Sequence, residues 1–207
     1  MSHLIDISPR ISPRIGVWPG DTPFSREVLL DVESGDNITL STIRTTVHLG
    51  AHTDAPNHYA RDSADIADRS LEFYYGSCEV MRVRVGRGQR IQASDLPRPP
   101  STPRLILRTD TFPDPDDFNT DFASLSADLV THLHNSGVRL VGIDTPSIDL
   151  FEDKVLESHN AVAQHDMAIL EGVVLSHVED GRYTLVALPL ALEGADASPV
   201  RAVLISD

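Results

Sequence analysis

Three of the nine histidines in this 207-residue chain fall within one eleven-residue segment, together with an aspartate. The segment reads His48-Leu49-Gly50-Ala51-His52-Thr53-Asp54-Ala55-Pro56-Asn57-His58. Neutral imidazole and carboxylate groups suit a divalent transition metal, most often zinc where there is neither a thiolate nor an all-oxygen cage. The segment therefore predicts a metal site, and a strand end that happens to be rich in histidine is the less favoured interpretation.

The backbone of this segment is predicted to be extended. A helix would place His48 and His52 on one face, but Gly50 weakens a helix and Pro56 breaks it. In an extended chain alternate side chains share a face, so the polar residues at even positions are expected to point the same way. Gly50 and Pro56 would then bend the chain around a central ion.

Hydrolysis is the chemistry that such a site favours. Three protein ligands leave a position for water, and a metal can lower the pKa of a bound water to roughly 7. His58 lies four residues beyond Asp54 and follows a proline by two positions, where its imidazole could transfer protons without binding metal. A fourth metal ligand and an exposed loop histidine are alternative roles for His58 that spacing leaves open.

A second group of candidate residues lies between Glu157 and Gly172. It contains His159 and Glu171, which are twelve residues apart, a spacing that no local geometry explains. Glu171 stands in the apolar run from Ala168 to Leu175, and a carboxylate among buried neighbours needs a compensating charge that a cation would supply. A solvent-exposed glutamate at a helix end is an equal alternative.

Trp18 opens a predicted turn. The sequence Trp18-Pro19-Gly20-Asp21 has proline at the second position and glycine at the third, where a positive φ is needed. The turn is either a plain surface feature or a means of presenting Trp18 as an aromatic wall for a ligand.

The elements that must position these residues are a mixture of strands and short helices, which predicts an α plus β fold in a single domain over 1–207. Six strands are expected: 38–47 running into His48, 79–85 as a half-buried strand, 104–109, 138–143, 183–188 and 200–205. One helix is expected over 126–135, capped by Ser126 and ended near Gly137, and a second over 160–174.

The charge balance bears on the partners. Seventeen Lys and Arg residues against 31 Asp and Glu residues give a net charge of −14, which disfavours nucleic acids and anionic membranes. The sequence has no apolar stretch of the roughly 20 residues that a membrane span needs and no visible secretory signal, so a cytoplasmic location is expected. Cys78, the single cysteine, is expected to be a buried hydrophobe and not a nucleophile.

The segment 48–58 resembles the HxGxHxDxPxH signature of the cyclase family of metal-dependent hydrolases. Within that family the chain is similar to the bacterial kynurenine formamidases, through the segment 18–24, the overall length, and the block from Ser158-His159 to Leu170-Glu171-Gly172. Ala51 stands where much of the wider family has threonine and fits the formamidase branch better. The resemblance runs nearly end to end.

This resemblance implies a metal centre with two ions per subunit. His48, His52 and Asp54 would hold one zinc, Asp54 would also bridge to a second zinc held by His159, and Glu171 would bind both. Manganese is an alternative metal. The implied fold is the swivelling β/β/α type, commonly a homodimer with the active site near the subunit interface.

The resemblance also implies an activity, the hydrolysis of N-formyl-L-kynurenine to L-kynurenine and formate. His58 would be the proton donor and acceptor, and Trp18 would line the substrate pocket. Two alternatives stand beside this expectation: a related hydrolase of another aryl or cyclic amide, like the isatin hydrolases, and a noncatalytic metal-binding or small-ligand-binding protein whose side chains fill every coordination position.

Overall fold

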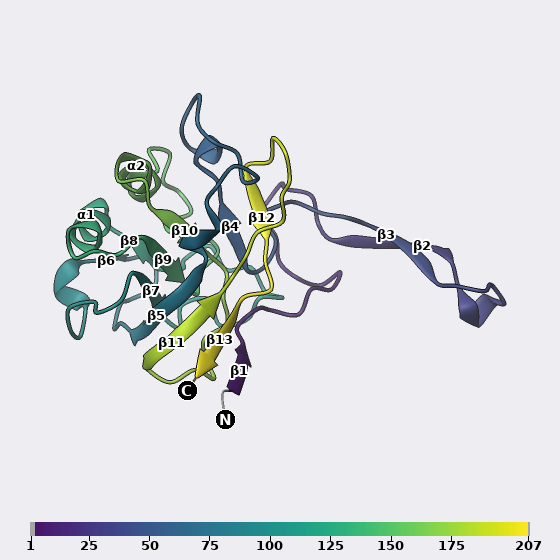
Figure 1. Cartoon of the computed structure of the whole chain (residues 1–207), viewed down its shortest axis with the longest axis horizontal. Helices are drawn as coiled ribbons and strands as arrows, with labels where there is room; N and C mark the ends of the chain where they lie inside the picture. Colours follow the sequence, from purple (N-terminus) through teal and green to yellow (C-terminus); the bar gives the residue numbers. More distant parts are fainter. Residues whose placement is uncertain (1–2, 207) are drawn as a thin grey trace.

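In the computed structural model, which describes residues 3–206, a seven-stranded mixed sheet forms the centre of the molecule (Figure 1). The order across the sheet is β1 (His3–Asp6), β13 (Val203–Ser206), β11 (Gly181–Val186), β5 (Tyr75–Arg82), β7 (Arg104–Arg108), β9 (Leu140–Ile143) and β10 (Ala168–Leu170). The four strands from β5 to β10 are parallel to one another, and the others pair antiparallel.

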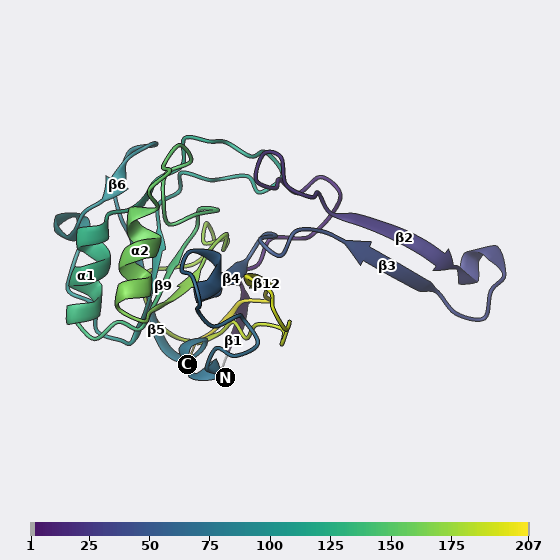
Figure 2. The same cartoon turned by 90° about the horizontal axis from the view of Figure 1, so that it is seen from above.

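Two helices, α1 (Ala127–Asn135) and α2 (Glu157–Gln164), lie side by side against one face of this sheet (Figures 1 and 2). Buried apolar residues of the helices, among them Leu129, Leu133 and Val162, pack with strand residues such as Leu107 and Val141 in one core cluster. This packing of an amphipathic stripe supplies most of the stability of helices this short.

The opposite face of the sheet carries a second core cluster, which includes Val80, Ile106, Leu170 and Leu204. Because both faces are covered, the centre of β5 is buried on both sides, and Val80 and Met81 are each 0% exposed. The prediction of a half-buried strand at 79–85 is therefore wrong at its centre. Strands covered on both faces lose the alternation of apolar and polar residues.

Several short elements complete the body. Two strand pairs, β4 (His52–Asp54) with β12 (Ala197–Pro199) and β6 (Arg90–Ile91) with β8 (Ser124–Leu125), lie outside the large sheet. The short 3-10 helices are η1 (Val32–Ser34), η2 (Pro56–His58), η3 (Leu71–Phe73) and η4 (Ala93–Asp95). All three residues of β4 are buried, so the centre of the histidine-rich segment lies inside the protein.

A hairpin arm formed by β2 (Ser25–Leu30) and β3 (Leu40–Arg44) projects from the body (Figure 2). Every residue of both strands is exposed. The predicted strand 38–47 is thus confirmed in type but wrong in extent, since it ends at Arg44 and does not run into His48. Its β-branched residues suit a strand, but they form an arm and not a core element.

The prediction of the first helix is confirmed. Ser126 Oγ accepts a hydrogen bond from the N–H of Leu129 at 3.1 Å, and Gly137 has a left-handed φ of +89°. The predicted strands 104–109, 138–143, 183–188 and 200–205 are confirmed in type, with observed bounds of 104–108, 140–143, 181–186 and 203–206.

The second predicted helix, 160–174, is confirmed only over 160–164 and is wrong beyond it. Helix α2 ends at Gln164, and Ala168–Leu170 forms β10, which pairs in parallel with β9. Positive φ values at Asp166 (+45°) and Gly172 (+66°) interrupt helical geometry on both sides of the apolar run. A short apolar run fits a buried strand as well as a helix segment, so periodicity could not separate the two.

Candidate active site

The histidine-rich segment meets the end of β10 through backbone pairing. The N–H of His52 donates to the carbonyl oxygen of Glu171 at 3.1 Å, and the N–H of Glu171 donates to the carbonyl oxygen of His52 at 2.9 Å. Gly50 (φ +58°) bends the chain before β4, and Pro56 begins the 3-10 turn after it. The predicted bending of the segment is confirmed at both positions.

The five predicted metal ligands converge around Asp54. His48 Nδ1 lies 3.1 Å from Asp54 Oδ1, and His159 Nε2 lies 3.4 Å from Asp54 Oδ2. Glu171 approaches from the other side, with Oε2 3.1 Å from His52 Nε2 and Oε1 3.8 Å from His159 Nε2. The structure thus brings together side chains from the segment 48–54, from α2 and from the position after β10, up to 123 residues apart (171 − 48).

The donor atoms fit a divalent cation. His52 Nε2 and Asp54 Oδ1 are buried and make no hydrogen bond of good geometry among residues 3–206, although Glu171 Oε2 and His48 Nδ1, respectively, lie 3.1 Å from them. A buried polar atom without a partner is costly, and a bound cation would satisfy both atoms. The donor atoms of His52, Asp54 and Glu171 lie close enough to share one ion, as do those of His48, Asp54 and His58.

Oxygen acceptors face the remaining nitrogen of His48, His52 and His159. The pairs are His48 Nε2 with Asp196 Oδ2 at 3.0 Å, His52 Nδ1 with the Gly50 carbonyl at 2.9 Å, and His159 Nδ1 with Asp149 Oδ2 at 2.8 Å. Such outer partners are typical of metal-binding histidines, because they fix the ring and its tautomer. The pattern supports a metal site over a chance cluster.

Carboxylates control the proton affinity of the imidazoles in the metal-free protein. Burial lowers the pKa of His48, but contacts with Asp54 and Asp196 outweigh it and raise this pKa to about 9. Burial likewise lowers the pKa of His159, while Asp149 and Asp54 raise it to about 10. Burial raises the pKa of Asp54, yet its contacts with His159 and His48 hold this pKa well below its ordinary value. A metal must displace these protons to bind.

His58 lies on the open side of the cluster. Its side chain is 33% exposed, its ring centroid lies 4.4 Å from that of His48, and its Nδ1 lies 3.3 Å from Asp196 Oδ2. Asp196 therefore contacts both His48 and His58. The position suits proton transfer to a molecule in the adjoining cavity, and the grouping with His48 and Asp54 keeps a ligand role open.

A cavity of about 490 Å³ opens beside the cluster, a volume typical of small-molecule sites. The predicted turn at Trp18 is confirmed, since the N–H of Asp21 donates to the Trp18 carbonyl at 2.9 Å and Gly20 has φ +96°. Trp18 lines the cavity, and its ring centroid is 4.8 Å from that of Phe151. Phe112 and Phe118 extend the aromatic lining.

Several residues of the site carried no motif in the sequence. Asp196 precedes β12 and reaches His48 from 148 positions away, a contact that no local pattern reveals. Asp149 had a weaker signal, because it lies in the loop after the parallel strand β9, at the sheet edge where ligand sites of α/β proteins form.

Cys78 takes no part in this site. It is 0% exposed in the core, and burial raises the pKa of its thiol to about 12. The expectation of a buried hydrophobe is confirmed.

Fold and cluster together define an α/β protein with a metal-binding site of histidines and carboxylates at the edge of its sheet. The chain belongs to the family described as "Putative cyclase", whose model matches residues 5–150. A kynurenine formamidase from Maricaulis maris (strain MCS10) is 40% identical over 206 residues, which are 99% of this chain and 98% of the relative.

Solved structures agree with this assignment. A structure described as a potential metal-dependent hydrolase with cyclase activity is 25% identical and superimposes with a TM-score of 0.85 over 100% of this chain and 99% of the other. Isatin hydrolase A from Ralstonia solanacearum, at 19% identity, shares the fold with a TM-score of 0.83 over 100% of this chain and 92% of its own. The expected cyclase-like fold is confirmed. No helix among residues 3–206 is long and apolar enough to cross a membrane.

Proposed function

We propose that this chain is a metal-dependent amidohydrolase that converts N-formyl-L-kynurenine to L-kynurenine and formate. One observation supports the proposal above all: His52 Nε2 and Asp54 Oδ1, buried atoms that make no hydrogen bond among the described residues, lie beside a cavity lined by aromatic rings. The donor atoms for a metal thus lie next to a pocket suited to an aromatic amide substrate. The relative named kynurenine formamidase, alike over almost the whole chain, supports this choice of substrate.

Two zinc ions per subunit are the proposed cofactor. His48, His52 and Asp54 would hold one ion, and Asp54 and His159 the other, with Glu171 shared between them. When bound, such ions supply Lewis acidity toward the amide carbonyl and lower the pKa of water. Zinc is the common choice for imidazole and carboxylate ligands, and manganese is the alternative.

The side chains around the ions would orient the substrate and move protons. His58 is proposed to deliver a proton to the departing aniline nitrogen, which is weakly basic and therefore a comparatively good leaving group. Asp196 Oδ2, 3.3 Å from His58 Nδ1, would hold the ring in this orientation. Trp18 offers a flat apolar face against the aromatic ring of the substrate and helps to exclude water.

A second candidate function is hydrolysis of another aryl or cyclic amide. The shared fold of the isatin hydrolases and an aromatic cavity that would accept a fused ring favour this alternative. A noncatalytic metal-binding role is disfavoured, because the cavity adjoins the donor cluster and leaves room for a reacting molecule.

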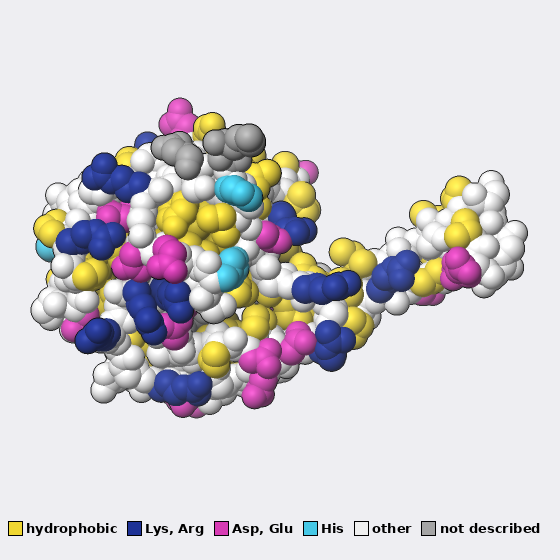
Figure 3. Space-filling model, turned by 90° about the horizontal axis from the view of Figure 1, so that it is seen from below, with side chains coloured by type: hydrophobic (Ala, Val, Ile, Leu, Met, Phe, Trp, Pro, Cys, Tyr) yellow, Lys and Arg dark blue, Asp and Glu magenta, His cyan; other side chains and the backbone are white. Residues whose placement is uncertain are grey.

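We further propose that the chain is a single domain located in the cytoplasm. It would form a homodimer through the hairpin arm. Hydrophobic side chains recur along the arm (Figure 3), and Leu29, Leu40 and Ile43 are 51%, 47% and 62% exposed. Exposed apolar groups on a lone hairpin typically mark a binding surface. The cavity residues Ile15–Asp21 directly precede the arm, which agrees with a site near the subunit interface.

Metal analysis and parallel substrate assays test the proposal. Purified protein should contain about two zinc ions per chain and should hydrolyse N-formyl-L-kynurenine in preference to isatin, followed by absorbance. Chelation should abolish turnover and added zinc should restore it. Faster hydrolysis of isatin would favour the second candidate, while full turnover after exhaustive chelation would contradict the metal mechanism.

A further inference from the structure

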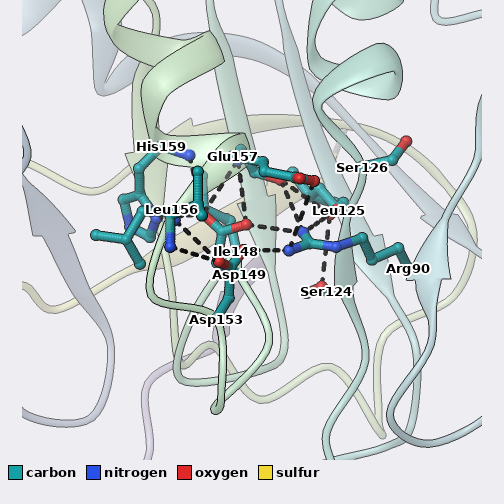
Figure 4. Close-up of polar contacts among 12 residues, drawn as sticks. Arg90, Ser124, Leu125, Ser126, Ile148, Asp149, Asp153, Leu156, Glu157 and His159 are labelled. Atoms are coloured by element: carbon teal, nitrogen blue, oxygen red, sulfur yellow. Dashed lines mark hydrogen bonds and ion pairs between the residues drawn. The ribbon is translucent and has the colours of Figure 1, made fainter.

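Asp149 is a fully buried carboxylate that belongs neither to the proposed ligand set nor to the proposed reaction (Figure 4). It lies in the loop between β9 and α2. Its Oδ2 accepts hydrogen bonds from His159 Nδ1 at 2.8 Å and from the His159 N–H at 3.0 Å. Both of its oxygens also accept from the N–H of Ser158 at 3.1 Å. Asp149 therefore holds the backbone and the ring of His159 at once.

The hydrogen bonds from the backbone N–H groups of Ser158 and His159 to Asp149 fix where α2 begins. Leu156 occupies the N-cap position with a φ of +56°, and a leucine side chain has no acceptor for the first-turn N–H groups. Asp149 accepts from these groups instead, and a carboxylate at a helix N-terminus also interacts favourably with the helix dipole. The starting point of the His159 side chain is thereby set by a residue outside the helix.

The hydrogen bond from His159 Nδ1 to Asp149 Oδ2 fixes the orientation of the His159 ring. Because Nδ1–H donates to Asp149, Nε2 faces Asp54 Oδ2 at 3.4 Å and Glu171 Oε1 at 3.8 Å. Loss of the Nε2 proton would leave a neutral imidazole that keeps its proton on Nδ1 and presents a lone pair at Nε2. Asp149 thus selects the tautomer whose free nitrogen points into the proposed metal site.

Arg90 on β6 holds Asp149 in turn (Figure 4). Its Nη1 donates to Asp149 Oδ1 at 2.7 Å and to the Leu125 carbonyl at 2.7 Å, and its Nη2 pairs with Asp153. A buried carboxylate without a cationic partner is strongly unfavourable. Burial raises the pKa of Asp149, but contacts with His159 and Arg90 lower it below its ordinary value, so Asp149 is ionised at neutral pH.

We propose that Arg90 and Asp149 form a positioning pair that fixes the ring and tautomer of His159 and thereby sets the affinity of the metal held by His159. The inference rests on the metal site of the proposed function. Both residues act through His159, since His159 Nε2 points away from Asp149 and toward Asp54 and Glu171.

Zinc affinity, measured by competition with a chromophoric chelator, tests the pair. The variants Asp149→Asn and Arg90→Met are expected to bind zinc about 10- to 100-fold more weakly than the wild type at the weakened site. Arg90→Lys keeps a positive charge and should recover part of the loss, which a purely steric role would not predict. Should Asp149→Asn fail to fold, Arg90→Met alone gives the answer.

The chain offers a matched control in Arg98, which pairs with the buried Glu79 (Nε to Oε1, 2.8 Å) on β5. Arg98→Met loses a similar ion pair and should lower thermal stability without changing zinc affinity. Unchanged zinc affinity in Arg90→Met and in a folded Asp149→Asn, or a loss no greater than that of Arg98→Met, would overturn the proposal.

The same measurements separate this inference from the proposed function. A wild type that binds no zinc would overturn both. Weakened zinc binding in the two variants, combined with a wild type that is inactive on N-formyl-L-kynurenine, would support the positioning pair and contradict the substrate.

Discussion

Gly172 lies so close to Gly50 that a Cβ atom on Gly172 would stand 2.1 Å from the Gly50 carbonyl oxygen. Gly172 also has a left-handed φ of +66°. This close approach joins the end of β10 to the histidine-rich segment, immediately beside the paired backbones of His52 and Glu171. The position of Glu171, a proposed metal ligand, thus depends on glycine at position 172.

Gly172→Ala is expected to lower the free energy of unfolding by about 2–4 kcal/mol, from the left-handed φ together with overpacking. Urea denaturation of the metal-free protein measures this loss. The zinc content of the folded variant should fall too, because relief of the clash must move Glu171 relative to His52.

Gly88→Ala is the matched control for this substitution. Gly88 has nearly the same φ of +67°, but nothing lies within 4 Å of the position of its Cβ. The free energy of unfolding of Gly88→Ala should fall only by the cost of placing alanine in a left-handed backbone, about 1–2 kcal/mol. Equal losses in the two variants would contradict the role assigned to the Gly50 contact.

His58→Ala should separate proton transfer from metal binding. We expect kcat to fall about 100- to 10,000-fold, as for loss of a general acid, with the zinc content unchanged. Metal analysis and steady-state kinetics on the same preparation measure both effects. His52→Ala is the comparison, since it removes a buried donor atom and should lose metal. Loss of zinc in His58→Ala would identify His58 as a ligand.

The stability of the metal-free protein should depend on pH through His48 and His159. Contacts with carboxylates raise their pKa values from 6.5 to about 9 and about 10 in the folded state. A raised pKa contributes stability that is fully present below pH 6.5 and is lost as the pH rises through 9 to 10. The melting temperature of the metal-free protein should therefore fall as the pH rises from 6.5 to about 10.

Zinc should reverse this dependence, because it binds only unprotonated imidazole. The increase in melting temperature on adding zinc should grow from about pH 6 to about pH 8 as protons compete less. Calorimetry in buffers of different ionisation enthalpy should also show proton release on binding. An increase in melting temperature that does not change with pH would contradict the protonated state assigned to the metal-free imidazoles.

Local chemistry in the sequence predicted the parts of the site that lie close together along the chain. Gly50 and Pro56 excluded a helix, and the alternation of an extended chain brought His52 and Asp54 to one buried strand. Asp196 was not predictable, because its contact with His48 spans 148 positions and is set by the pairing of β12 with β4. Periodicity reports neighbours within a turn or a strand, whereas register between distant strands depends on the whole core.

The same limit explains the errors in the fold. The apolar run of β10 is three residues long, and its pairing with β9 decides its structure. The arm has strand propensity in its sequence, yet propensity does not say whether a hairpin packs on its own body or projects from it.

The hairpin arm should control the oligomeric state. In the double variant Leu29→Asp with Ile43→Asp, two exposed apolar side chains become charged, and a dimer formed through the arm should dissociate into monomers. Light scattering after gel filtration measures the mass. Leu71→Asp, at a position on η3 that is 54% exposed, is the control and should leave the mass unchanged. A wild type that is monomeric at micromolar concentration would contradict the proposal.

Trp18 should determine how tightly the aromatic part of the substrate binds. Its ring packs against Phe151 and Phe118 at centroid distances of 4.8 and 5.8 Å and lines the cavity. Loss of one aromatic contact is worth about 0.5–1.5 kcal/mol, so Trp18→Ala should raise KM about 2- to 12-fold. Because Trp18 is not a proposed metal ligand, zinc content should stay constant, and Trp18→Phe should recover most of the loss. A fall in kcat without a change in KM would show that the ring positions the reacting amide and does not merely bind the substrate.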